Sequence, residues 1–239
     1  MDEEIRSGLL VRYPDTKLNC GEQLDYLFRE WSERLPNSLR VTDTVEYTFW
    51  TPNRNLYLTD IREGLKPWWK NSYPANTFIE LHVRPDGRPW GNALIAIEAI
   101  ALIGNQADNR QSHFLSGGTI IGHAKLLRFE DRDELFFSGV VALTETAAGL
   151  EILSPNDLIG QVRVCIDKIN EVCGKAAIPK SAIDLIEVFL PRRHYPFAST
   201  IVEMLWRKFR APQISCRQVD GLFMDGLLVE IRPHAVVWK

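Results

Sequence analysis

Apolar residues recur along the chain at helical and strand spacings, in an order that the sequence runs through twice. In the first half, Leu24, Leu27 and Trp31 mark an apolar helical stripe, and the residues after Thr44 alternate as in a strand. The elements predicted there are a helix over 24–35, a strand over 44–50, a helix over 58–68, and strands over 77–83 and 92–103. The turn-rich residues 84–89 separate the last two strands.

The second half repeats this order of helix, strand, helix, strand, strand. Its predicted elements are a helix over 158–172, a strand over 183–190, a helix over 198–209, and strands over 214–219 and 227–238. Two more strands, over 118–127 and 134–143, precede them, whereas the first half has only residues 5–12 in that place. The first unit therefore looks truncated.

Similar residues recur at matching places in the two halves. The pairs are Gln23 with Gln161, Val45-Glu46 with Ile186-Glu187, Ile61 with Ile201, and Pro74 with Pro212. The polar residues 104–112 are typical of a linker, so we expect one unit over 1–108 and a second over 109–239. Each unit would be a sheet with two helices on one face, which is an α+β arrangement.

Composition narrows the class of protein. The chain is 45% apolar and 25% charged, as in ordinary globular proteins, and its net charge of −3 argues against a nucleic-acid partner. The longest apolar run, residues 93–103, is interrupted by Glu98 and is too short to cross a bilayer, which takes about 20 residues. The acidic start is unlike a signal peptide. We expect a cytoplasmic protein without a membrane partner.

The cysteines and histidines predict no metal site. The four cysteines show no Cys-x-x-Cys spacing and are expected to be reduced thiols. No pair of histidines has the i, i+4 spacing of a helical metal site.

Several short segments carry a resemblance to a known family. In the second half they are 136–139 (Phe-Phe-Ser-Gly), Gln161 at a helix start, Pro212 before a strand, and 227–231 (Leu-Leu-Val-Glu-Ile). In the first half they are 74–76 (Pro-Ala-Asn) and 93–101. The sequence resembles the Rid family (YjgF-like enamine/imine deaminases), and in layout it is most similar to the chorismatases built from the same unit.

The resemblance implies two Rid/chorismate-mutase-like units in tandem, with the first truncated. It also implies a small-molecule enzyme that needs neither metal nor organic cofactor. Rid proteins resemble one another in forming trimers with clefts between subunits, so a homotrimer or a compact monomer would both suit this chain.

Two family positions bear on the chemistry. The arginine with which Rid deaminases grip a substrate carboxylate is replaced here by Asn76 in the first half and by Ile214 in the second. Glu230 stands where chorismatases carry the general acid that protonates the enolpyruvyl group, whereas the first half has Ala96 there. The resemblance therefore implies one catalytic site per chain, with Glu230 as its acid, although Glu230 could equally form a structural ion pair with Arg232 on the same strand face.

Four arginines are candidate binders of a carboxylated substrate. Arg217 lies in the strand before that of Glu230, Arg192 and Arg193 follow a strand end, and Arg128 ends another strand. Surface arginines are common, so each could also be solvated. Ser138 matches a Rid position that helps to bind substrate, or it caps a turn.

Three hypotheses about function follow. The first is a chorismatase-like hydrolase or lyase that acts on chorismate or a related carboxylated biosynthetic intermediate. The second is a diverged Rid-type enzyme that acts on an imine, enamine or other reactive intermediate. The third is a non-catalytic binding protein that kept the fold.

Overall fold

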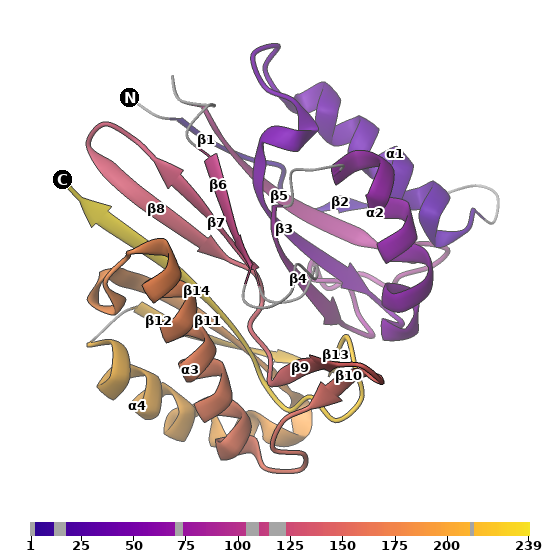
Figure 1. The fold of residues 1–239 in the computed structure, drawn as a ribbon. Coiled ribbons are helices and arrows are strands. Elements are labelled where there is room, and N and C mark those ends of the chain that lie inside the picture. The colour runs from indigo at the N-terminus through magenta and orange to yellow at the C-terminus, as the bar shows by residue number, and fades with distance from the viewer. Residues whose placement is uncertain (1–2, 12–17, 70–73, 104–109, 115–122, 211–212) are drawn as a thin grey trace. The chain divides into compact units, whose positions relative to one another are not determined.

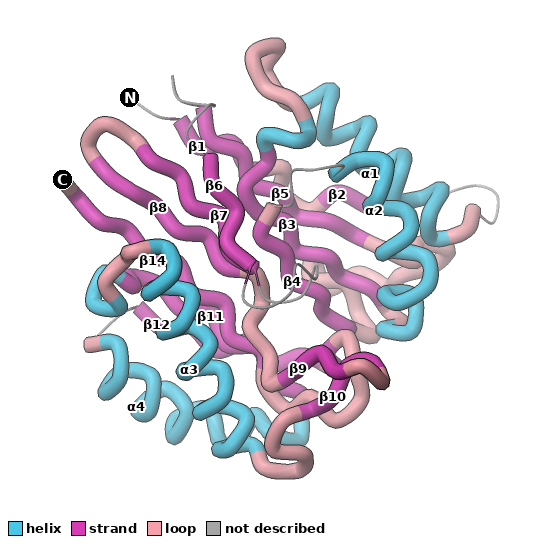
Figure 2. The backbone as a smooth tube through the Cα atoms, in the orientation of Figure 1, coloured by secondary structure: helices cyan, strands magenta, loops and turns pink. Residues whose placement is uncertain are grey.

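The computed structural model describes residues 3–11, 18–69, 74–103, 110–114, 123–210 and 213–239. The chain divides into two compact units, Met1–Ala107 and Asp108–Lys239. Each unit is a sheet with helices on one face (Figures 1 and 2). The mixed α+β class predicted from the sequence is confirmed.

The first unit is built on the central strand β5. Its elements are β1 (Glu3–Arg6), β2 (Leu10–Val11), α1 (Cys20–Arg34), β3 (Thr44–Thr51), a π turn over Tyr57–Ile61 that leads into α2 (Arg62–Trp69), β4 (Ala75–Glu80) and β5 (Ala96–Ile103). The strands lie in the order β1-β5-β3-β4, and β2 also pairs with β5. β3 and β4 are parallel, and the pairs made by β5 are antiparallel.

Helix α1 begins at a capping box. The Asn19 side chain accepts a hydrogen bond from the Glu22 amide at 2.9 Å, and the Glu22 carboxylate accepts one from the Asn19 amide at 2.8 Å. This reciprocal pair is a capping box, which satisfies amide groups that a helix start leaves open. The apolar stripe predicted from the sequence is buried: Leu24, Leu27 and Trp31 are each at 0% exposure.

The second unit carries β6 to β14 and the helices α3 and α4. Its elements are β6 (Arg110–Phe114), β7 (His123–Arg128), β8 (Arg132–Phe137), β9 (Leu143–Thr146), β10 (Gly149–Ile152), α3 (Leu158–Ala176), β11 (Ile183–Pro191), α4 (Ala198–Phe209), β12 (Gln213–Val219), β13 (Gly221–Leu222) and β14 (Glu230–Trp238). The main sheet has the order β12-β11-β14-β8-β7-β6. β9 and β10 form a separate hairpin.

One face of this sheet packs on α3 and α4. The core draws alternate residues from the strands, such as Val229 and Ile231 of β14, together with Ile169 of α3 and Leu205 of α4. Because side chains alternate across a strand, Glu230, Arg232 and His234 lie on the other face of β14. The same rule puts Glu187 and Phe189 of β11 on that face.

The two units share one strand topology. The order β12-β11-β14-β8 in the second unit matches β4-β3-β5-β1 in the first. In both, the first pair is parallel and the next two are antiparallel. A bulge interrupts the pairing at the same place, between Thr44 and Glu46 in one unit and between Ile183 and Leu185 in the other. The repeat predicted from the sequence is thus present in the strand pairing.

The register corrects one pair of the repeat. Trp50 pairs with Ala96, and Phe189 pairs with Glu230, so these two pairs correspond. Counting back along the strands, Thr48 and not Glu46 stands at the place of Glu187. The strand register therefore differs by two residues from the pairing of Val45-Glu46 with Ile186-Glu187, which rested on residue type alone.

Several predicted boundaries differ from the observed ones. The strand expected over 134–143 ends at Phe137, and Leu143 begins the unpredicted β9–β10 hairpin. β4 ends at Glu80, before the predicted end at residue 83. The predicted linker 104–112 overlaps β6, because residues 110–112 are strand, and residues 104–109 are outside the described ranges. The strand expected over 118–127 is described only from His123 on.

Candidate active site

Glu230 opens β14 with a buried carboxyl group. The residue is 2% exposed, and among the described residues its Oε2 atom has no hydrogen-bond partner. Burial raises the pKa of this carboxyl to about 8, against a smaller lowering by the charge of Arg232. Glu230 is therefore mostly a neutral acid at pH 7, able to donate a proton.

Gly139 leaves the space that the Glu230 carboxyl fills. A Cβ atom built on Gly139 would lie 1.6 Å from Oε1 of Glu230, so any larger residue there would force the carboxyl group out of its place. The next residue, Val140, exchanges two backbone hydrogen bonds with Ile231, of 2.8 and 3.0 Å. The chain after β8 thus lies directly against the start of β14, and glycine at the point of contact lets the Glu230 carboxyl keep its position.

Arg232 pairs with Glu187 rather than with Glu230. The two residues are directly opposite in the β11–β14 register, and Nε of Arg232 donates to Oε2 of Glu187 at 2.9 Å. On the neighbouring strand, Nη2 of Arg217 lies 2.9 Å from the other carboxylate oxygen of Glu187. Of the two side chains, that of Arg232 is 9% exposed and that of Arg217 is 50% exposed, so Arg217 is the more accessible of the two.

The other predicted binders lie at different places. Arg192 and Arg193 are exposed in the turn between β11 and α4; Arg192 lies 3.6 Å from Asp220, and Nε of Arg193 is 2.9 Å from Nε2 of His194. Ser138 is 2% exposed and precedes Gly139. In the strand register, Arg128 is opposite Asp133 of β8, and Asp133 is opposite Val237 of β14. Arg128 therefore lies level with the end of β14 that is far from Glu230, and it is not part of the proposed site.

His234 joins this face of the sheet, although the sequence analysis did not single it out. Its Nδ1 lies 3.0 Å from Oδ1 of Asp184, and its Nε2 lies 3.7 Å from Oε2 of Glu134. Burial alone would lower the pKa of His234, but the hydrogen bond with Asp184 and the negative charges of Asp184 and Glu134 raise it to about 9. The i, i+2, i+4 spacing of Glu230, Arg232 and His234 was the available signal.

The positions of the missing Rid arginine hold no cation. Ile214 is opposite Ile186 in the register and packs against the core beside the helices. Asn76 is 5% exposed, and its Nδ2 donates to the Pro74 carbonyl at 3.2 Å. Neither side chain can form the bidentate ion pair with a carboxylate that an arginine provides.

Gln161 and Gln23 do the same work in the two units. The Gln161 side chain accepts from the Leu228 amide at 2.9 Å and donates to the Gly226 carbonyl at 2.9 Å. The Gln23 side chain accepts from the Leu94 amide at 2.8 Å and donates to the Asn92 carbonyl at 3.1 Å. Each glutamine holds the chain two residues before the position occupied by Glu230 in one unit and by Ala96 in the other.

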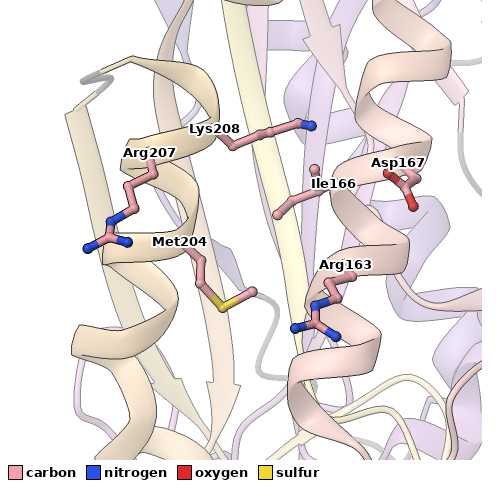
Figure 3. A pocket seen from close by; sticks show the side chains of 6 residues that line it. All are labelled: Arg163, Ile166, Asp167, Met204, Arg207 and Lys208. Atoms are coloured by element: carbon pink, nitrogen blue, oxygen red, sulfur yellow. The ribbon is translucent and has the colours of Figure 1, made fainter.

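A surface groove of about 480 Å³ lies elsewhere in the second unit, between α3 and α4 (Figure 3). Its lining includes Arg163 and Ile166 of α3 and Met204 and Lys208 of α4. The helices lie on the core side of the sheet, so this groove is separate from the face that carries Glu230.

Within the described residues, no group of three or more His, Cys, Asp or Glu side chains could hold a metal ion. In the same part of the chain, no helix is long and apolar enough to span a membrane.

Comparison with known proteins gives the fold a precedent. No family model and no curated protein sequence matches the chain. Among solved structures, a chorismatase aligns over 97% of this chain and 74% of its own, with a TM-score of 0.67 and 15% identity. The chain resembles chorismatase in fold.

Single Rid proteins match about half of the chain. YyfA of Yersinia pestis, a Rid protein of unknown function, aligns over 53% of this chain and 100% of its own, with a TM-score of 0.41 and 21% identity. Rv2704 of Mycobacterium tuberculosis, from the YjgF family, aligns over 53% and 100%, with a TM-score of 0.39 and 18% identity. The chorismatase-like layout of two Rid-like units, predicted from the sequence, is confirmed by the alignment with chorismatase together with the repeated strand topology.

Proposed function

We propose that the protein is a chorismatase-like enzyme that removes an enolpyruvyl group from a carboxylated cyclic intermediate, with chorismate as the first candidate. Glu230 is the observation that carries this proposal, because a buried carboxyl with a pKa of about 8 is protonated where the reaction needs an acid. The proposed reaction would need neither a metal nor an organic cofactor.

The reaction requires one proton and one water molecule. Glu230 gives its proton to the terminal CH₂ carbon of the vinyl ether, which leaves positive charge shared between the ether carbon and oxygen. Water adds to that carbon, and its proton returns to the Glu230 carboxylate. The resulting hemiketal breaks its bond to the ring oxygen, which releases pyruvate and leaves a hydroxyl on the ring.

Arg217 is the cation that we assign to a substrate carboxylate. Its side chain is half-exposed, and Nη2 contacts Glu187 at 2.9 Å, so other N–H donors of the guanidinium would be open to a ligand. Arg192, Arg193 and Ser138 stay in the proposal as further contacts of the substrate. Arg232 is instead a buried partner of Glu187 and supports that array.

The alternatives are weaker for stated reasons. Asn76 and Ile214 remove the carboxylate grip on which Rid deamination depends. A protein that kept only the fold would have no use for Glu230, because a buried polar atom without a partner costs free energy.

The test is turnover of chorismate by the purified chain. Pyruvate release is followed with a coupled lactate dehydrogenase assay, and the ring product by chromatography. Replacing Glu230 by Gln removes the proton but keeps the shape, and we expect it to lower turnover by about 10²–10⁴-fold.

The matched control is Glu98→Gln in the central strand of the first unit. Glu98 accepts a 2.9 Å hydrogen bond from Nε1 of Trp50, which an amide oxygen can also accept, so turnover should not change. Full activity of Glu230→Gln would show that the acid lies elsewhere. No consumption of chorismate by the unmodified protein would end the chorismatase proposal, and imine substrates would then be tested.

A further inference from the structure

One stripe of α3 hydrogen-bonds to both chain segments that meet at Glu230. The stripe consists of Gln161, Cys165 and Lys168, at positions i, i+4 and i+7, which share one helix face. Gln161 holds the residues just before Glu230, as described above. The other two side chains reach the segment 140–143 that follows Gly139.

The contacts of Cys165 and Lys168 are made with backbone carbonyl groups. Sγ of Cys165 donates to the Val140 carbonyl at 3.4 Å. Nζ of Lys168 donates to the Val141 carbonyl at 3.0 Å and also to the Leu143 carbonyl. An ammonium group that binds two carbonyls forms charge-assisted hydrogen bonds, which are stronger than neutral ones.

The position of the Lys168 ammonium group is unfavourable for its charge, because the group is largely removed from water. Burial lowers the pKa of its ammonium group, partly offset by Cys165 and Glu171. A lysine on a helix can usually extend into water. Here it turns inward instead and binds the segment that leads away from Gly139.

The first unit lacks this arrangement where it lacks the acid. Counting from Gln23, the corresponding positions are Leu27, which is a core residue, and Glu30, which pairs with Arg34 on α1. Only the glutamine of the stripe is shared. The glutamine therefore belongs to the fold, whereas the lysine accompanies Glu230.

The residue at the place of Gly139 differs in the same sense. Leu10 pairs with Ile97 as Val140 pairs with Ile231, so the register puts Leu9 at the place of Gly139. The first unit thus has a large residue in that position and Ala96 on the central strand. The second unit has no side chain in that position and a carboxyl group on the central strand.

We propose that Lys168 is a positioning residue for Glu230: by holding the carbonyls of Val141 and Leu143, it keeps Gly139 against the carboxyl group and keeps water away from it. This inference rests on the proposed function only for its catalytic meaning, because the position of Glu230 can be measured without a substrate.

The test is the titration of Glu230 in the full chain, followed by ¹³C NMR of side-chain carboxyls and assigned with Glu230→Gln. In Lys168→Met we expect the midpoint to fall by about one pH unit, because water that reaches the carboxyl removes part of the effect of burial. Loss of a nearby positive charge alone would raise the midpoint, so the sign separates positioning from a charge effect. Amide hydrogen exchange at Val140 and Ile231 should accelerate at least tenfold.

The control is Lys175→Met on the same helix. Lys175 pairs with Glu171 at the surface, 2.6 Å away, and its loss should move neither measurement. An unchanged or raised midpoint in Lys168→Met would overturn the proposal. If that variant does not fold, Lys168→Gln, whose shorter side chain can reach one carbonyl, should lower the midpoint by a smaller amount, and an unchanged midpoint there overturns the proposal equally.

These outcomes are distinguishable from a failure of the proposed function. A lowered midpoint without turnover of any substrate would support Lys168 as a positioning residue and reject the chorismatase activity. Turnover in the unmodified protein with an unchanged midpoint in both lysine variants would do the reverse.

Discussion

At the scale of single residues, Glu230 combines burial with an oxygen atom that lacks a hydrogen-bond partner among the described residues. Such a group lowers the stability of the fold as soon as it ionises, since its charge would be separated from water. Gly139 makes the burial sterically possible, and the Arg232–Glu187 pair satisfies the neighbouring charges without using the Glu230 carboxyl. In our proposal, this carboxyl is thereby left available to the substrate.

We predict that Glu230→Gln stabilises the protein in alkaline solution. The pKa of Glu230 rises from 4.5 to about 8 on folding, so the folded state binds more protons than the unfolded state between these values, and the free energy of unfolding falls as pH rises through that window. The amide has no such loss. At pH 9 the variant should exceed the unmodified protein by on the order of 4–5 kcal/mol, relative to their difference at pH 4.

Urea unfolding at both pH values measures this difference. The contribution of His234 is present in both proteins and cancels in the comparison. Parallel pH profiles for the two proteins would contradict a buried, neutral Glu230.

At the scale of elements, α3 organises the site through its side chains rather than through its end. Its glutamine fixes the approach to β14, and its cysteine and lysine fix the segment after β8. Helix α1 does only the first of these tasks, for β5. The same element has therefore a purely structural role in one unit and a proposed positioning role in the other.

We predict that Gln161→Leu and Gln23→Leu cost similar stability but differ in their effect on turnover. Each leaves one backbone amide and two carbonyls without the side-chain partner, at about 2–4 kcal/mol. Only Gln161 hydrogen-bonds to the residues that lead into β14, so Gln161→Leu alone should lower turnover, by about tenfold or more. Chemical denaturation and the pyruvate assay measure the two effects, and equal losses of activity would contradict the division of roles between the units.

The sequence predicted the order of elements, the glutamine pair and the face on which Glu230 lies, because these depend on periodicity and local spacing. It did not predict the β9–β10 hairpin, whose exposed residues carry no strong pattern. The correct partner of Glu187 was missed because Val45-Glu46 resembles Ile186-Glu187 in residue type, whereas only the strand register shows that Thr48 stands at that place. Lys168 looked like any charged helix residue, because its two partners are carbonyl groups, and the sequence does not encode where those lie.

At the scale of the whole molecule, the chain repeats one strand topology, but only the second unit carries a glutamate at the place of Glu230 on its central strand and a glycine facing it. The first unit keeps the glutamine, the bulge and the parallel pair, but it replaces glutamate by Ala96 and the facing glycine by Leu9. The chorismatase-like fold therefore brings two similar frames and, in our proposal, a single reaction centre. A chain with one centre should bind one equivalent of a tight inhibitor.

The exchange of Gly139 and Glu230 for Leu9 and Ala96 has a genetic consequence. If the two units arose by duplication, the unit without the acid can accept substitutions as long as it still folds. Its residues at these places are then constrained only by the volume that they fill. A library of variants selected for activity should accept many apolar residues at 9 and 96, and pairs whose sizes compensate. Positions 139 and 230 should accept almost nothing but glycine and glutamate. The difference in tolerance between the two pairs of positions would then show which unit is under selection for activity and which only for folding.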